Sequence, residues 1–142
     1  MLELHSRLLA ELDAELERKH GLPLSSYELL INLADAEGRR VRMSELAEKL
    51  LLSRSGITRL ADRLERQGLI ERQRCPDDGR GLFAHLTSAG DAKLDAARPT
   101  HLAGVRRHFL DLLSVDEQRE LGALWKRLEG QSPAPELDAV AR

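Results

Sequence analysis

RQRCPDDGRGLFAHLT, residues 72–87, contains two short extended runs joined by a turn, in a chain that otherwise has helical periodicity almost throughout. Here the hydrophobic period changes from 3.6 to 2, which is typical of strands, and residues 76–80 have the composition of a turn. We therefore expect strands over residues 69–75 and 81–86. A hairpin alone is only marginally stable in water, so this one must pack against the elements around it.

The segment that precedes the hairpin predicts two helices joined by a tight turn. Residues 44–52 have helical spacing of their apolar side chains, and residues 54–67 follow with a second apolar stripe. Ser53 stands where the second of these helices needs an N-cap, and Gly68 stands where it should end. The order helix, turn, helix, hairpin predicts a winged helix-turn-helix, in which the hairpin is the wing.

Further helices are expected before this unit. Leucines at four-residue spacing predict an amphipathic helix over residues 2–19, which should end before Gly21. Ser25 and Glu28 have the spacing of a capping box, so we expect a second helix from there to about residue 36.

Two more helices are expected after the hairpin. Thr87 should cap a long helix that continues as far as Leu113, and Pro99 should kink or divide it. A second capping box at residues 114–117 predicts a last helix, which Gly130 should close. The tail over residues 131–142 is expected to be loosely ordered. The predicted fold is mainly α with a small β-hairpin wing, in a single domain over residues 1–130.

Composition and charge limit the possible functions. The chain has 142 residues, of which 42% are hydrophobic and 32% charged, which is ordinary for one soluble, helix-rich domain. The longest apolar runs are too short to cross a membrane, and the acidic N-terminal segment does not resemble a signal peptide. A single cysteine excludes an internal disulfide and fits a reducing cytoplasm.

The charge is unevenly distributed along the chain. Residues 39–85 hold 11 Lys and Arg against 7 Asp and Glu, whereas residues 1–38 hold 3 against 8, and residues 86–142 hold 8 against 9. The expected winged helix-turn-helix is therefore the basic part of a chain whose net charge is −2. A basic segment of this kind is a candidate surface for a polyanion.

SELAEKLLLSRSGITRLADRLERQGLIERQRCPDDGRGLFAHLTSAG, residues 44–90, resembles the helix-turn-helix and wing of the MarR family of transcriptional regulators. The most specific part is the turn at residues 78–80, followed by Leu86-Thr87 and a helix start of small residues through Gly90. The resemblance implies a homodimer with dimerisation helices at about 2–20 and 87–130. It also implies that the winged helix-turn-helix, at about 25–86, binds a pseudo-palindromic operator in double-stranded DNA.

The resemblance also implies roles for individual residues. The helix over residues 54–67 would enter the major groove, and the wing arginine, Arg80, would reach the flanking minor groove with Asp78 to orient it. The residues that would line the DNA from the helix are Ser53, Arg54, Ser55, Thr58, Arg59 and Arg63. These residue types suit the roles, because an arginine can pair with both acceptors of a guanine and a narrow A·T minor groove attracts arginine.

The function implied is a ligand-responsive transcription factor, more readily a repressor than an activator. Its effector would be a small aromatic or anionic molecule held between the dimerisation helices and the DNA-binding lobe, with pocket residues that the sequence leaves unassigned. The alternative is a helical dimeric protein-interaction module that does not bind DNA. A gel shift on DNA upstream of the protein's own gene would separate the two.

Catalytic, metal-binding and redox interpretations have little support in the sequence. There is no glycine-rich phosphate loop, no HExxH and no supported Ser/His/Asp arrangement, so we do not expect an enzyme. Cys75 lies in the expected wing without a second cysteine, which argues against redox sensing. No metal or cofactor is expected, because the histidines form no compact cluster with metal-ligand spacing: they are His5, His20, His85, His101 and His108.

Overall fold

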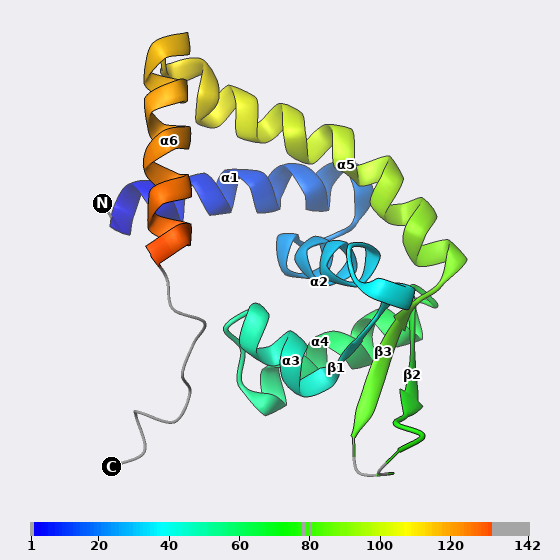
Figure 1. Ribbon diagram of the computed structural model, residues 1–142. Coiled ribbons are helices and arrows are strands. Elements are labelled where there is room, and N and C mark those ends of the chain that lie inside the picture. Colours follow the sequence, from blue (N-terminus) through cyan, green and yellow to red (C-terminus); the bar gives the residue numbers. More distant parts are fainter. Residues whose placement is uncertain (1, 78, 80, 132–142) are drawn as a thin grey trace. The chain divides into compact units, whose positions relative to one another are not determined.

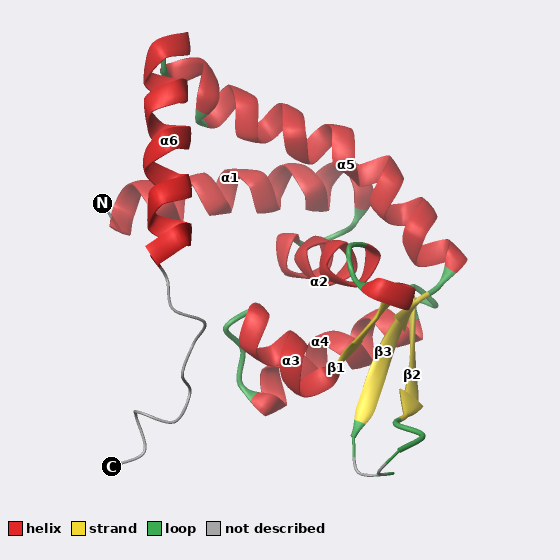
Figure 2. Cartoon of the chain, viewed as in Figure 1, coloured by secondary structure: helices red, strands yellow, loops and turns green. Residues whose placement is uncertain are grey.

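A computed structural model describes residues 2–77, 79 and 81–131 of the chain as a mainly helical fold with one small sheet (Figures 1 and 2). The helices are α1 (Leu2–His20), α2 (Leu24–Ala34), α3 (Met43–Lys49), α4 (Arg54–Arg66), α5 (Ser88–His108) and α6 (Val115–Gln131). The strands are β1 (Arg40–Arg42), β2 (Ile70–Arg74) and β3 (Leu82–Leu86), and the short helical turns are η1 (Glu37–Arg39) and η2 (Leu110–Leu112). The chain divides into two compact units, Met1–Val105 and Arg106–Arg142.

The core of the first unit is built mainly from leucine. Helix α2 lies between α1 and the α3–α4 pair (Figure 1), and its Leu29, Leu30 and Leu33 are fully buried. Helix α1 contributes Leu12 and Leu16 to the same core. Each such side chain contributes roughly 1.5–3 kcal/mol relative to an exposed one, so α2 holds the winged helix-turn-helix together from within.

The wing belongs to a three-stranded antiparallel sheet with the order β1-β3-β2. The expected hairpin is confirmed: β2 is one residue shorter than predicted at each end, and β3 begins one residue later and ends as predicted. Strand β1 was not expected. The buried Ala84 of β3 pairs with Val41 of β1 on one side and with Arg72 of β2 on the other. The third strand and the helices behind it are what stabilise the hairpin.

Three predicted helix caps are confirmed by hydrogen bonds. Ser53 Oγ accepts from the amide three residues further on, at 3.0 Å. Thr87 Oγ1 accepts from the Gly90 amide in the first turn of α5, also at 3.0 Å. The capping box before α6 is reciprocal, because the Ser114 amide donates to Glu117 Oε2 at 2.7 Å and the Glu117 amide donates to Ser114 Oγ at 3.3 Å.

The capping box predicted for α2 is wrong. The helix begins at Leu24 with Pro23 in the N-cap position, and no side chain of the segment caps it. The Leu24 amide instead donates to Asp13 Oδ1 of α1, at 2.7 Å. Proline presets φ for the start of a helix, and the cap comes from another helix, so the Ser25 signal has no role there.

Several predicted boundaries also differ. Helix α3 ends at Lys49 rather than residue 52, because Leu51 adopts a positive φ of 54° that terminates it. Helix α2 stops at Ala34, two residues before the expected end.

The C-terminal helices differ from expectation in a similar way. Pro99 does not divide α5, which continues to His108 and stops there, short of the expected Leu113. Helix α6 continues one residue beyond Gly130. The tail prediction falls on residues 132–142, which lie outside the described part of the chain.

Candidate nucleic-acid interface

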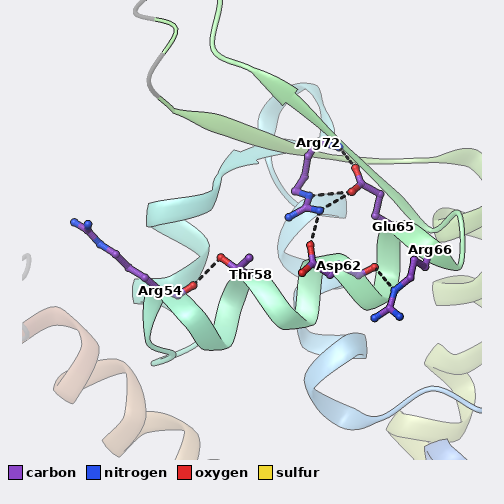
Figure 3. Close-up of polar contacts among 6 residues, drawn as sticks. All are labelled: Arg54, Thr58, Asp62, Glu65, Arg66 and Arg72. Atoms are coloured by element: carbon purple, nitrogen blue, oxygen red, sulfur yellow. Dashed lines mark hydrogen bonds and ion pairs between the residues drawn. The ribbon is translucent and has the colours of Figure 1, made fainter.

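Helix α4 separates an apolar face from a polar one. Four apolar side chains pack against the core, none more than 7% exposed: Ile57, Leu60, Ala61 and Leu64. The opposite face exposes Arg54, Ser55, Thr58 and Arg59. Figure 3 shows Arg54 extending away from the helix, while the Thr58 hydroxyl donates to the Arg54 carbonyl at 2.8 Å. Four of the predicted site residues are thus brought together on one exposed face.

The other two predicted residues of this segment already have partners within the fold. The Ser53 hydroxyl caps α4 and lies 3.2 Å from Ser55 Oγ. Arg63 donates from Nη2 to Ser26 Oγ at 2.9 Å, and Ser26 is a buried residue of α2. The structure therefore places the Arg63 guanidinium against α2, where it links the two helices.

The two acidic residues of α4 are both occupied by Arg72 of β2 (Figure 3). Arg72 Nη2 donates to Asp62 Oδ1 and to Glu65 Oε2, each at 2.6 Å. Its backbone amide donates to Glu65 Oε1 at 2.9 Å, and its Nε donates to Oε2 at 3.1 Å. These hydrogen bonds hold the pKa of Glu65 below its usual value.

Arg72 thereby joins the wing to α4 through one largely buried guanidinium. The sequence shows two carboxylates three residues apart on α4, which indicates that they share one helix face. It gives no sign that their partner is in the following strand, so the contribution of Arg72 was missed. Arg72 compensates one of these two negative charges, and neither carboxylate is paired with Arg54 or Arg59.

The predicted tip residues of the wing, Asp78 and Arg80, lie outside the described residues. The hairpin beside them is closed by two backbone bonds, from the Cys75 amide to the Gly81 carbonyl at 2.9 Å and from the Gly79 amide to the Cys75 carbonyl at 3.2 Å. Gly79 has a φ of 64°, which favours glycine. Cys75 is buried at the base of this turn.

More positive charge lies where the sheet meets α3. The guanidinium carbons of Arg40 and Arg42 lie 5.0 and 5.1 Å from the centroid of the Phe83 ring, which is cation–π geometry. A cavity of about 290 Å³ lies between β1, α3, α4 and β3, and polar side chains from three of these elements line it. They are Arg42, Ser44, Arg54 and Thr58. The exposed face of α4 is thus continuous with a recess beside the wing that both apolar and polar side chains line.

The histidines of α5 do not add a metal centre to this surface. His101 stacks on Tyr27 with ring centroids 4.5 Å apart, and its burial lowers its pKa. Residues 2–77, 79 and 81–131 hold no group of three or more His, Cys, Asp or Glu placed to ligate one ion. Within the same residues, no helix is long and apolar enough to span a membrane.

A winged helix-turn-helix with a basic, exposed fourth helix defines a class of regulators, and comparison with known proteins identifies the family. The model of the MarR family matches residues 20–81. The uncharacterized HTH-type transcriptional regulator YkoM of Bacillus subtilis is 34% identical over 110 residues, which cover 78% of this chain and 70% of YkoM. The transcriptional repressor MprA of Escherichia coli is 30% identical over 140 residues, which cover 98% of this chain and 78% of MprA.

Solved structures agree with this assignment. Sco3205, a MarR family transcriptional regulator from Streptomyces coelicolor solved in complex with DNA, matches with a TM-score of 0.82 and 37% identity, over 94% of this chain and 85% of Sco3205. The chain belongs to the MarR family of transcriptional regulators. The family resemblance and the winged helix fold expected from residues 44–90 are therefore confirmed.

Proposed function

We propose that this protein is a homodimeric repressor that binds a pseudo-palindromic operator in double-stranded DNA. The observation that carries the proposal is the exposed face of α4, on which Arg54, Ser55, Thr58 and Arg59 lie together. The acidic residues of the helix, Asp62 and Glu65, pair with Arg72 and not with these arginines. The DNA in the Sco3205 structure and the repressor activity in the name of MprA support it. A regulator of this kind acts on the chromosome, so the proposal includes a cytoplasmic location.

In this proposal α4 enters the major groove. Arg54 and Arg59 can each pair with a guanine, while Ser55 and Thr58 reach bases or phosphates. The first turn of α4 offers free backbone amides to a phosphate, although Ser53 Oγ already accepts one of them. Arg63, held by Ser26, would act at the edge of the interface by fixing the angle of α4 on α2.

The dimer follows from apolar surface that one chain leaves uncovered. Leu4 and Leu9 of α1 and Leu124, Trp125 and Leu128 of α6 are exposed. Burial of such side chains against a second copy is favourable, and a two-fold dimer presents two recognition helices. An inverted repeat with half-sites about one helical turn apart is the expected operator. We further propose that a small aromatic or anionic effector weakens operator binding by changing the separation of the two lobes.

The proposal is tested by selecting bound DNA from a random-sequence pool and measuring affinity for the recovered duplex. Arg54→Ala and Arg59→Ala should each weaken binding by about 1–3 kcal/mol, and affinity should fall steeply with salt. Arg119→Ala in α6 removes the same charge from a surface ion pair with Asp116 and should have little effect. Failure of the parent protein to enrich any sequence would favour the helical interaction module instead.

The wing is tested separately. Arg80→Ala should leave folding intact and weaken operator binding by about 1–3 kcal/mol, with relaxed preference at the flanking A·T pairs. Asp78→Ala should cause a smaller loss, because the arginine remains but is no longer held by charge-assisted hydrogen bonds. If Arg80→Ala binds as tightly as the parent, the wing does not read DNA and Asp78 has no orienting role.

A further inference from the structure

Leu51, in the turn between α3 and α4, combines two unfavourable properties. Its side chain is 92% exposed, the largest value among the large hydrophobic residues that the structure describes, and its φ is 54°. The Leu51 amide donates to the Glu48 carbonyl at 3.1 Å, and the next amide, of Leu52, donates to the Ala47 carbonyl at 2.8 Å. These bonds end α3 in the manner of a Schellman motif, with Leu51 at the position that usually holds glycine.

The rest of the described chain follows the usual preference at positive φ. Glycine occupies four such positions, at residues 21, 38, 68 and 79. The one other exception is Arg39, and its side chain forms an ion pair with Asp91 at 2.6 Å. A leucine in the left-handed region is strained, and the described residues leave its side chain almost fully exposed. Backbone strain of this kind concentrates at functional positions.

The position of Leu51 indicates what its side chain is for. It stands three residues before Arg54 and directly before the exposed N-terminal end of α4. Ser53 and Ser55, which follow it, are exposed and uncharged, while the exposed Glu48 and Lys49, which precede it at the end of α3, have opposite charges. In the proposed complex this end of α4 lies in the major groove. The apolar group that the major groove presents is the C5-methyl of thymine.

We propose that Leu51 reads a thymine in each half-site through contact with its C5-methyl group, which adds an apolar contact to the polar ones of α4. This inference rests on the proposed DNA-binding function. A glycine at the same position would relieve the strain and lose the contact. A methionine would keep an apolar side chain of similar length, so the two substitutions make a matched pair.

The first experiment repeats the selection from random-sequence DNA with the parent protein, Leu51→Gly and Leu51→Met. We expect one thymine per half-site in the parent motif to lose its preference in Leu51→Gly and to keep it in Leu51→Met. The melting temperature of Leu51→Gly should equal or exceed that of the parent, since glycine suits the left-handed region. That measurement separates a lost contact from a damaged fold.

The second experiment removes the methyl group from the DNA. The duplex selected by the parent is prepared with deoxyuridine in place of each thymine in turn, and the parent should lose about fourfold in affinity at the proposed position, the value of one buried methyl-sized group. Leu51→Gly should bind the thymine and deoxyuridine duplexes equally there. Equal sensitivity of both proteins at every position, or identical motifs from both selections, would overturn the inference. If the parent selects no sequence at all, the proposed DNA-binding function fails, which is a distinct result.

Discussion

Helices α4 and α6 are both amphipathic, but among the described residues the apolar face of α4 is covered and that of α6 is exposed. The stripe of α4 is almost completely buried against α2, α3 and the sheet. On α6, Leu124, Trp125 and Leu128 are 45%, 60% and 63% exposed. The difference indicates that the DNA-reading part is completed by one chain, whereas the C-terminal unit requires a second copy to cover it.

The second unit has a recess that suits this interpretation. An apolar hollow of about 490 Å³ is lined by Phe109, which precedes η2, and by residues of η2 and α6 that include Leu121 and Trp125. An apolar hollow flanked by exposed apolar side chains is a candidate interaction site. The dimer proposed above would fill it with apolar side chains of the partner.

The largest expected effect comes from placing charge on the uncovered face. Trp125→Asp combined with Leu128→Asp should weaken dimerisation by about 4 kcal/mol or more, because both anchors are lost and carboxylates are buried. Sedimentation equilibrium measures the change, with Arg119→Asp as a control for added negative charge. The winged helix-turn-helix should stay folded in both variants. If the parent protein sediments as a 15.9 kDa monomer at micromolar concentration, no second copy covers the apolar face of α6, and the contrast drawn with α4 is wrong.

The next largest effect is expected from Gly90→Ala, which should destabilise the winged helix-turn-helix of the first unit. A Cβ on Gly90 would lie 2.0 Å from the Leu69 carbonyl oxygen and 2.7 Å from Leu86 Cδ1, so the backbone at the base of the wing would have to move. We expect Gly90→Ala to lower the free energy of unfolding by about 3 kcal/mol, as overpacking does. Urea denaturation measures this loss. Ala92→Gly, at an exposed position of the same helix, should cost only about 1 kcal/mol through helix propensity.

A smaller effect should follow from separating the wing from α4. Arg72→Ala should cost about 1–2 kcal/mol, since it removes charge-assisted hydrogen bonds to carboxylates that are partly screened by solvent. Arg72→Lys should lose less stability than Arg72→Ala, because a lysine keeps the positive charge. It should still fall short of the parent, because an ammonium group cannot donate to Asp62 and Glu65 with the fixed geometry of a guanidinium. The loss is read from urea denaturation, and a parallel reduction in operator affinity is expected.

This contribution should depend on pH in a defined direction. The pKa of Glu65 is lowered in the folded state, so its stabilisation is present above the pKa of an unfolded glutamate and is lost as pH falls through the lower folded value. The difference in unfolding free energy between the parent and Arg72→Ala should therefore shrink in acid. A difference that is constant between neutral and acidic pH would argue against the ion pair as its cause.

The smallest effects should come from the two helix caps, which offer a direct comparison of the two regions. Ser53→Ala should cost about 1 kcal/mol by leaving a first-turn amide of α4 without its acceptor. Ser114→Ala removes the corresponding bond before α6 and frees Glu117. We expect only the second loss to depend on protein concentration, because α6 is stabilised by dimerisation. Thermal unfolding at several concentrations checks this difference.

The sequence predicted those parts of the fold that depend on local signals. The apolar stripe of α4, the Ser53, Thr87 and Ser114 caps, and the wing hairpin all follow from spacing over a few residues, and the structure confirms them. Strand β1 was missed because three residues carry no period. Its pairing partner, β3, lies about 40 residues away in the sequence.

Three of the errors and omissions have the same physical cause, which is that the deciding partner lies on another element of the fold. Asp13 caps α2 from another helix, which made the Ser25 prediction wrong. Likewise, Ser26 receives the Arg63 guanidinium, and Arg72 receives both carboxylates of α4. Side-chain pairings of this kind are set by tertiary packing. Residue type and spacing therefore predicted which face of α4 is polar, but not which of its side chains already form hydrogen bonds within the fold.

The Arg72 contacts also limit how a signal can travel through the protein. Four hydrogen bonds from Arg72 join β2 to α4, so the base of the wing and the helix move together while these bonds are intact. Turning the helix without moving the base of the wing would break these bonds, at a cost of about 1–2 kcal/mol. In the proposed dimer, the motion that keeps these bonds intact changes the distance and angle between the two winged helix-turn-helix units, and an effector that weakens DNA binding would act on that distance and angle.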